Sequence, residues 1–144
     1  MPHRPIRTII ENQAILTAPS AMTVSDAARL MKQNKTGALL VCDERRLVGV
    51  FTERDALFRV TAEERDPKST LVSDVMTPNP QTIHPDKPLG HALHMMYEGG
   101  FRNVPVVEDG QPIGMVSARD ALGPERKEFV SEMDQREHIA EILG

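Results

Sequence analysis

Several residue types are scarce in this chain of 144 residues, and each scarcity excludes a class of protein. Tryptophan is absent and aromatic residues make up 3%, which argues against stacking platforms for single-stranded nucleic acid. The single cysteine, Cys42, cannot form an internal disulfide. It sits in the apolar run 38–42, which predicts a buried and inert thiol in a reducing, cytoplasmic setting.

A net positive charge and long apolar runs are also lacking. The formal net charge is −4, which argues against a nucleic-acid binder that neutralises phosphates. No apolar run approaches the roughly 20 residues that span a bilayer, so we expect no membrane segment. Residues 1–13 contain no apolar h-region or small-residue cleavage site, so no signal peptide is predicted.

An internal repeat dominates what is present. Residues 47–57 (LVGVFTERDAL) align with residues 112–122 (PIGMVSARDAL) at an offset of 65 residues. The alignment extends back to Val24 and Leu89 without a gap. Chance is a poor explanation for similarity of this length, so the chain is two copies of one unit.

Each unit predicts the element order β-α-β-β-α, and hence an α/β (α+β) fold. The helix is indicated by apolar residues at helical spacing, the strands by apolar runs, and the hairpin by an acidic or glycine-containing turn. In order, the expected elements are a strand near 15–16 and 82–83, a helix through 27–31 and 92–96, strands at 38–42 and 103–107, strands at 47–51 and 113–116, and a helix from Thr52 or Ser117.

The domain organisation follows from the repeat. We expect an N-terminal extension (1–14), repeat one (15–60), a polar linker (61–75), repeat two (76–123) and a C-terminal helix (124–144). A unit of about 50–60 residues buries little apolar surface alone, so the two repeats are expected to share a core. The helical faces carry apolar residues that a lone module would leave uncovered, which predicts a homodimer: Ala28, Leu57, Phe58, Leu93 and Leu122.

A Gly-x-x-Thr/Ser-x-x-Asp motif ends the second strand of each unit. It consists of Gly49, Thr52 and Asp55 in repeat one and of Gly114, Ser117 and Asp120 in repeat two. A tandem β-α-β-β-α unit with this motif closely resembles the CBS (cystathionine-β-synthase type) domain, over about Ile15 to Leu122. Residues 72–77 also resemble the lead-in segment that such families place before a repeat. Before Thr17 no such segment is recognisable, and Leu40 stands where repeat two has Pro105.

The resemblance implies a regulatory module with two clefts that bind adenosine compounds. The ligands known for such clefts are AMP, ADP, ATP, S-adenosylmethionine and sometimes a dinucleotide such as NAD. The resemblance further implies a homodimer that signals to a protein target which the sequence does not identify.

The motif residues suit such a ligand. The glycines let another group approach the strand, and the hydroxyls and free N–H groups at the helix start can hold a phosphate. Asp55 and Asp120 can accept both hydrogens of a ribose diol. The candidates around the adenine are Ile83, Val104 and Met115, and Thr82 and Pro105 are further ligand-binding candidates. For phosphates the candidates are Arg102 and Arg119, with Lys35 and Arg54. Thr52-x-x-Asp55 and Ser117-x-x-Asp120 also resemble a capping box, which needs no ligand.

Metal and catalytic readings are weaker. His91, His94 and Glu98 could share one helix face, but a solvated polar face is the preferred interpretation and no metal is predicted. Met31, Met95 and Met96 are read as core or as a contact surface, and His84 as part of a turn. No nucleophile with its base, carboxylate pair or phosphate-cradling loop is found, so the chain is predicted not to be an enzyme and to hold no catalytic cofactor. Two functions remain open: a sensor of adenosine nucleotides, or a dimerisation scaffold with vestigial clefts.

Overall fold

The computed structural model describes residues 4–123, 131–133 and 135–136. Its first half contains α1 (Ile6–Ile10), β1 (Thr17–Ala18), α2 (Val24–Gln33) and the hairpin β2 (Ala38–Asp43) and β3 (Arg46–Thr52). A helical stretch follows, made of α3 (Glu53–Asp55) and the π-helical turn η1 (Ala56–Thr61). The lead-in segment of repeat two then forms α4 (Val72–Val75) and β4 (Thr77–Pro78).

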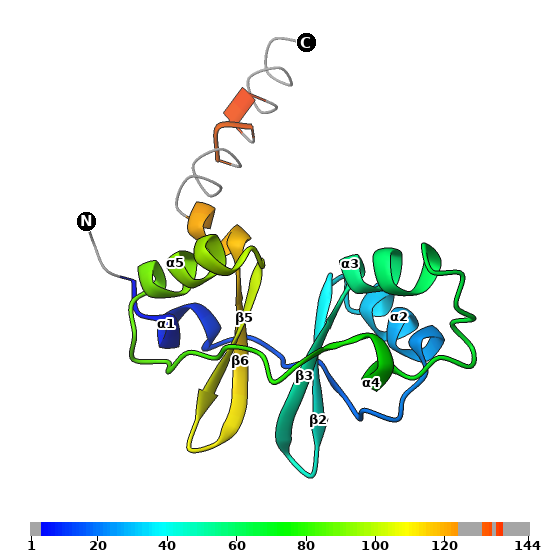
Figure 1. The fold of residues 1–144 in the computed structure, drawn as a ribbon. Coiled ribbons are helices and arrows are strands. Elements are labelled where there is room, and N and C mark those ends of the chain that lie inside the picture. Colours follow the sequence, from blue (N-terminus) through cyan, green and yellow to red (C-terminus); the bar gives the residue numbers. More distant parts are fainter. Residues whose placement is uncertain (1–3, 124–130, 134, 137–144) are drawn as a thin grey trace.

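The second half repeats this order. It contains α5 (Leu89–Gly99), the hairpin β5 (Asn103–Glu108) and β6 (Gln111–Ser117), and the 3-10 helix η2 (Ala118–Leu122). The two halves lie beside each other, with their hairpins pointing the same way (Figure 1). Of the predicted C-terminal helix, residues 131–133 and 135–136 are helical, and the rest lies outside the described residues.

The strand registers confirm the 65-residue offset. In repeat one Ala18 pairs with Val41 in parallel, and in repeat two Ile83 pairs with Val106 in the same sense. The short first strand of repeat one therefore lies at Thr17–Ala18, two residues later than predicted. Both hairpin turns place their central residues at positive φ, a geometry that suits a tight two-residue connection.

The two sheets differ at one edge. Strands β1, β2, β3 and β4 form a four-stranded sheet, in which Gly49 and Val50 pair with Pro78 and Thr77. In repeat two, β5 and β6 form a two-stranded sheet, and the matching edge of β6 is met by a side chain. Gln13 donates from Nε2 to the carbonyl of Met115 (2.9 Å) and accepts from the Met115 N–H (2.7 Å). A single side-chain amide thus replaces the strand pairing that β4 makes in repeat one.

The hydrophobic core is divided, which corrects the expectation of one shared core. One cluster, around Leu39, Val41 and Phe51, belongs to repeat one and is completed by Val72 and Val75 of α4. The other cluster, around Val104, Val106 and Val116, belongs to repeat two and is completed by Ile6 and Ile10 of α1. Figure 1 shows α1 beside α5 and the β5–β6 hairpin, on the side of repeat two. Each small core gains the apolar surface it lacks from a short lead-in helix.

Each repeat therefore packs on the lead-in helix of the other repeat. This exchange shows that repeat one also has a lead-in segment, which forms α1. Helix α1 stands in register with α4 at the 65-residue offset, and Ile10 is buried as Val75 is. The lead-in segment of repeat one could not be recognised from the sequence, because Arg7 and Ile9 occupy the positions equivalent to Val72 and Asp74 and differ from them in residue type.

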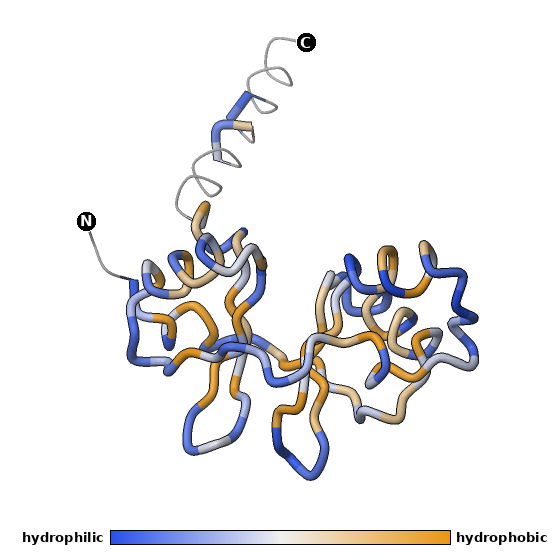
Figure 2. The backbone as a smooth tube through the Cα atoms, in the orientation of Figure 1, coloured by the Kyte–Doolittle hydropathy of each residue, from blue (hydrophilic) through white to orange (hydrophobic). Residues whose placement is uncertain are grey.

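The hydropathy pattern matches this arrangement. Apolar backbone colours follow the packed parts of the strands and helices, and the two hairpin turns are hydrophilic (Figure 2). Helices α2 and α5 bury Ala27, Met31, Ala92 and Met96, as the helical spacing predicted. Within the described residues, no helix has the length and apolar character needed to cross a membrane.

Candidate functional site

The two Gly-x-x-Thr/Ser-x-x-Asp motifs form helix caps in the structure. At repeat one the Thr52 hydroxyl accepts from the Asp55 N–H (3.2 Å), and Asp55 Oδ2 accepts from the Thr52 N–H (2.9 Å). At repeat two Asp120 Oδ2 accepts from the Ser117 N–H (2.8 Å). The capping interpretation is therefore confirmed. It occupies one oxygen of each carboxylate and leaves the other available for a further partner.

The two motif glycines permit a close approach that the chain itself makes. A methyl group on Gly49 would lie 2.9 Å from the Thr77 carbonyl oxygen. A methyl group on Gly114 would lie 2.9 Å from Ile10 Cβ and from Gln13 Oε1. Each glycine thus gives room to the lead-in segment packed on its repeat, and ligand contact at these positions stays a prediction.

A cleft of about 710 Å³ lies between the repeats, next to the motif of repeat two. This volume is within the range of about 300–1,000 Å³ typical of small-molecule sites. We call it the repeat-two cleft. Its lining comes from the N-terminal segment, from repeat one and from repeat two: Arg4, Thr8, Ile9, Gln13, Ala14, Ile15, Leu16, Asn34, Thr36, Ala38, Leu40, Asn103, Met115, Ser117, Arg119, Asp120 and Gly123.

Four of the predicted ligand residues meet in the repeat-two cleft: Met115, Ser117, Arg119 and Asp120. Thr82 lies elsewhere, in a second hollow of about 720 Å³ beside the hairpin turns. Gly49, Thr52, Asp55, Lys35, Arg54 and Arg102 are not part of the cleft lining.

The predicted adenine contacts Val104 and Ile83 are placed differently by the structure. Both side chains are buried in the core of repeat two. Side chains alternate along a strand, so β5 points Val104 and Val106 into the core while Asn103 lines the cleft. Pro105 is also fully buried. The same alternation in β2 points Leu39 inward and brings Ala38 and Leu40 to the cleft.

Residues before position 15 line the cleft, although they were predicted to be an extension. Arg4 Nη2 donates to the backbone carbonyl of Asp120 (2.8 Å), which holds its guanidinium at the cleft wall. Gln13 is fixed there by its two bonds to Met115. Continuing the 65-residue alignment into weakly similar sequence would have indicated this segment, because Gln13 then falls opposite Pro78 of β4.

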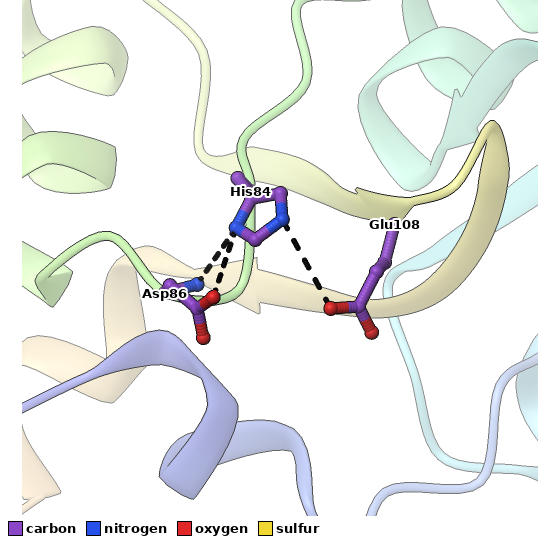
Figure 3. A group of neighbouring side chains, drawn as sticks. All are labelled: His84, Asp86 and Glu108. Carbon is purple, nitrogen blue, oxygen red and sulfur yellow. Dashed lines mark hydrogen bonds and ion pairs between the residues drawn. The ribbon is translucent and has the colours of Figure 1, made fainter.

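An ion-pair network ties α1 to repeat two. Arg7 contacts Asp86 (3.0 Å) and Glu108, and His84 lies near both carboxylates. Figure 3 shows His84 between Asp86 and Glu108. The ligand atoms of these three residues lie within 4.8 Å of one another, as in a metal site. Arg7 already supplies a positive charge to both carboxylates, so we assign the group as an ion-pair network. The Arg7 guanidinium lowers the pKa of Glu108 below its ordinary value.

The other candidate groups do not assemble. Among the residues that the structure describes, His84, Asp86 and Glu108 come together as possible metal ligands, whereas His91, His94 and Glu98 do not. His94 lies 3.6 Å from Glu98 on the exposed face of α5. Cys42 is half-buried, and burial together with the nearby Asp43 raises the pKa of its thiol. A raised pKa keeps the thiol protonated and unreactive, as expected of a structural cysteine.

Fold and cleft together define a class of protein: a tandem-repeat module with a cleft between its halves. The CBS-domain family model matches residues 6–62 and 72–123. The CBS domain-containing protein CBSCBSPB3 of Arabidopsis thaliana is 41% identical over 108 residues, which are 74% of this chain and 19% of that protein. The CBS domain-containing protein YhcV of Bacillus subtilis is 32% identical over 115 residues, 80% of this chain and 81% of that protein. The chain therefore belongs to the CBS-domain family.

The relatives differ in length. The chain spans about a fifth of the length of the first Arabidopsis relatives and most of the length of YhcV. Among solved structures, the CBS domain pair of protein MJ0100 is similar to this chain with a TM-score of 0.78 and 26% identity. The similarity covers 88% of this chain and 99% of that chain. That structure is a complex with 5′-methylthioadenosine and S-adenosyl-L-methionine.

Proposed function

We propose that this protein is a regulatory module that binds an adenosine nucleotide in the repeat-two cleft and signals its presence to a protein target. The observation that carries the proposal is the composition of the cleft wall. Ser117 and Asp120 of repeat two face a cleft whose other walls are β2 of repeat one and the N-terminal segment. A ligand there touches both halves of the molecule, so its binding favours one relative arrangement of the repeats.

The lining offers a partner for each part of an adenosine nucleotide. Ile15 and Met115 supply apolar surface for the adenine. Asp120 has one oxygen committed to the Ser117 N–H, and the other can accept from a ribose diol. Arg4 and Arg119 outnumber the one acidic residue of the lining, which favours a ligand that carries phosphate. The nucleotides AMP, ADP and ATP fit this charge, as does NAD, whereas S-adenosylmethionine carries a sulfonium charge.

The alternative is a dimerisation scaffold whose clefts are vestigial. The observation that favours it is the capping box, which is complete without any ligand. Ligand titration separates the two functions, because a vestigial cleft does not bind and a sensor does.

The first experiment is a titration of the intact chain with AMP, ADP, ATP, NAD and S-adenosylmethionine, followed by melting temperature and by calorimetry. We expect binding of at least one nucleotide, with about 2.7 kcal/mol of stabilisation at ligand concentrations near 100 times Kd. Inorganic phosphate should give a smaller shift, since it contacts only the cationic end of the cleft. Failure of all five compounds to bind would leave the scaffold function.

A substitution at Asp120 tests whether this residue binds ribose. In Asp120→Asn the affinity should fall roughly ten- to a hundredfold, because the charge that holds the diol is removed. The stability of the unliganded protein should fall by only a few tenths of a kcal/mol. Asp26→Asn is the matched control, because Asp26 also lies in the first turn of a helix and is absent from the cleft. A large loss of stability with unchanged affinity would assign Asp120 to capping alone.

A homodimer is the second part of the proposal. Leu57 and Leu122 occupy equivalent positions in the two repeats and are 55% and 60% exposed. Phe58 beside Leu57 is also 55% exposed, so both repeats present apolar helical surface. A second copy of the module would cover both patches through one two-fold contact.

A further inference from the structure

Asp55 and Asp120 are equivalent in sequence but not in surroundings. Each accepts from the backbone N–H of its cap residue through Oδ2, at 2.9 Å and 2.8 Å. Asp55 is only 6% exposed, whereas Asp120 is half-buried and lines the repeat-two cleft. The two carboxylates therefore differ in how readily a ligand can reach the oxygen that the cap leaves over.

Arg59 accounts for this difference. Its Nε lies 3.5 Å from Asp55 Oδ1, and its Nη1 donates to the carbonyl oxygens of Val75 (3.2 Å) and Met76 (3.0 Å). The guanidinium thus joins the carboxylate to the end of α4, which belongs to the lead-in segment of repeat two. A ribose diol at Asp55 would have to displace a charged partner that is itself held by two further oxygens.

The sequence of repeat two has no arginine at the position equivalent to Arg59. The residue at the 65-residue offset is Pro124, whose side chain carries no donor. Between residues 4 and 123, no basic side chain forms an ion pair with Asp120. Two further positions near the motifs differ between the repeats. Ser69 stands opposite Arg4 and Phe58 opposite Gly123. In repeat two the Arg4 guanidinium packs against Gly123, whereas repeat one has a serine and an exposed phenylalanine at the equivalent positions.

We infer that Arg59 holds Asp55 in an internal ion pair that closes the ligand site of repeat one, so that each chain binds one nucleotide, at Asp120. The inference rests on the proposed function for the identity of the ligand. To the proposed function it adds the number of nucleotide sites in each chain and the residue, Arg59, that determines this number.

Calorimetric titration with the best-binding nucleotide tests the inference. The wild-type chain should bind one ligand, and Asp120→Asn should weaken that single site roughly ten- to a hundredfold. Arg59→Gln should add a second site, because glutamine removes the positive charge that pairs with Asp55 and can still donate to the carbonyls at the end of α4. Adding Asp55→Asn to Arg59→Gln should weaken the new site roughly ten- to a hundredfold, as Asp120→Asn weakens the site of repeat two.

The possible outcomes are distinguishable. Two sites in the wild type, or a site of undiminished affinity in Asp120→Asn, would overturn the inference without any Arg59 variant. One site in a folded Arg59→Gln, as judged by circular dichroism and cooperative melting, would also overturn it. If the wild type binds no nucleotide, the proposed function fails. The single site at Asp120 would fail with it. A site gained in Arg59→Gln would then support only the role of Arg59 at Asp55, and no gain would end both proposals.

Discussion

A methyl group at Gly114 has no space in this structure. It would lie 2.9 Å from each of three atoms, Ile10 Cβ, Ile10 Cγ2 and Gln13 Oε1, and two of these belong to a buried side chain. Contacts this short force the lead-in helix α1 away from β6 or distort the strand. The glycine of the motif is therefore required by packing, whatever its relation to a ligand.

Gly114→Ala should destabilise the protein by about 1–3 kcal/mol, the usual cost of overpacking a core. Gly90→Ala is the matched control, since Gly90 lies in α5 with no atom within 4 Å of the added carbon. Alanine should stabilise the helix there by about 0.5–1 kcal/mol. Urea denaturation of the two variants measures both effects. Equal stability of Gly114→Ala and the wild type would show that α1 is not seated against β6.

At the scale of elements, α1 is held to repeat two by charge as well as by packing. Glu108 of β5 faces Arg7, His84 and Asp86, and Arg7 lowers its pKa from the ordinary value of 4.5. A carboxylate with a lowered pKa in the folded state stabilises the protein above its ordinary pKa. This contribution is lost as the pH falls below 4.5 and through the lowered value.

Glu108→Gln should therefore be less stable than the wild type at pH 7, and the difference should shrink as the pH falls below about 4.5. The pair is exposed to solvent, so added salt should also reduce the difference. Denaturation curves at several pH values measure it, with Glu11→Gln at the end of α1 as the control. A pH-independent difference would mean that Glu108 acts through its packing and not through its charge.

The elements themselves could be predicted from the sequence, whereas their exchange could not. Hairpins, helices and caps depend on neighbours in the chain, and two similar copies indicated each of them twice. The contact of Ile10 with repeat two depends on residues far along the chain, and no local pattern reveals it. The cleft lining was therefore predictable only where it belongs to a local motif. Ser117 and Asp120 belong to a motif, but Arg4 and Gln13 reach the cleft only through the position of α1.

The sequence also did not determine which side chains of a strand face the core and which face the cleft. Val104 and Asn103 are adjacent in sequence and point to opposite faces of β5. A run of apolar residues such as 103–107 does not show which face meets a helix and which meets a cleft. The structure buries Val104 in the core of repeat two, and contact of this residue with a ligand stays a prediction.

At the scale of the whole molecule, the exposed leucines predict a self-association that can be removed. Light scattering should give about twice the 16.0 kDa of one chain at micromolar concentration. The double variant Leu57→Glu with Leu122→Glu should give the mass of one chain, because charge at the centre of an apolar contact opposes its burial. Circular dichroism should be unchanged, since both side chains are exposed. A monomeric wild type, or a double variant with the wild-type mass, would contradict the proposed dimer.

The exchange of lead-in helices makes the two halves unequal during synthesis on the ribosome. Helix α4 follows repeat one directly, so the core of repeat one can close as soon as Val75 has emerged. Helix α1 is made first, yet Arg7 and its partner Glu108 are 101 residues apart. At about 5–20 residues per second, α1 waits roughly 5–20 s for the strands that bury Ile6 and Ile10. Repeat one can therefore fold early during translation, whereas α1 is among the last elements to pack in its final position.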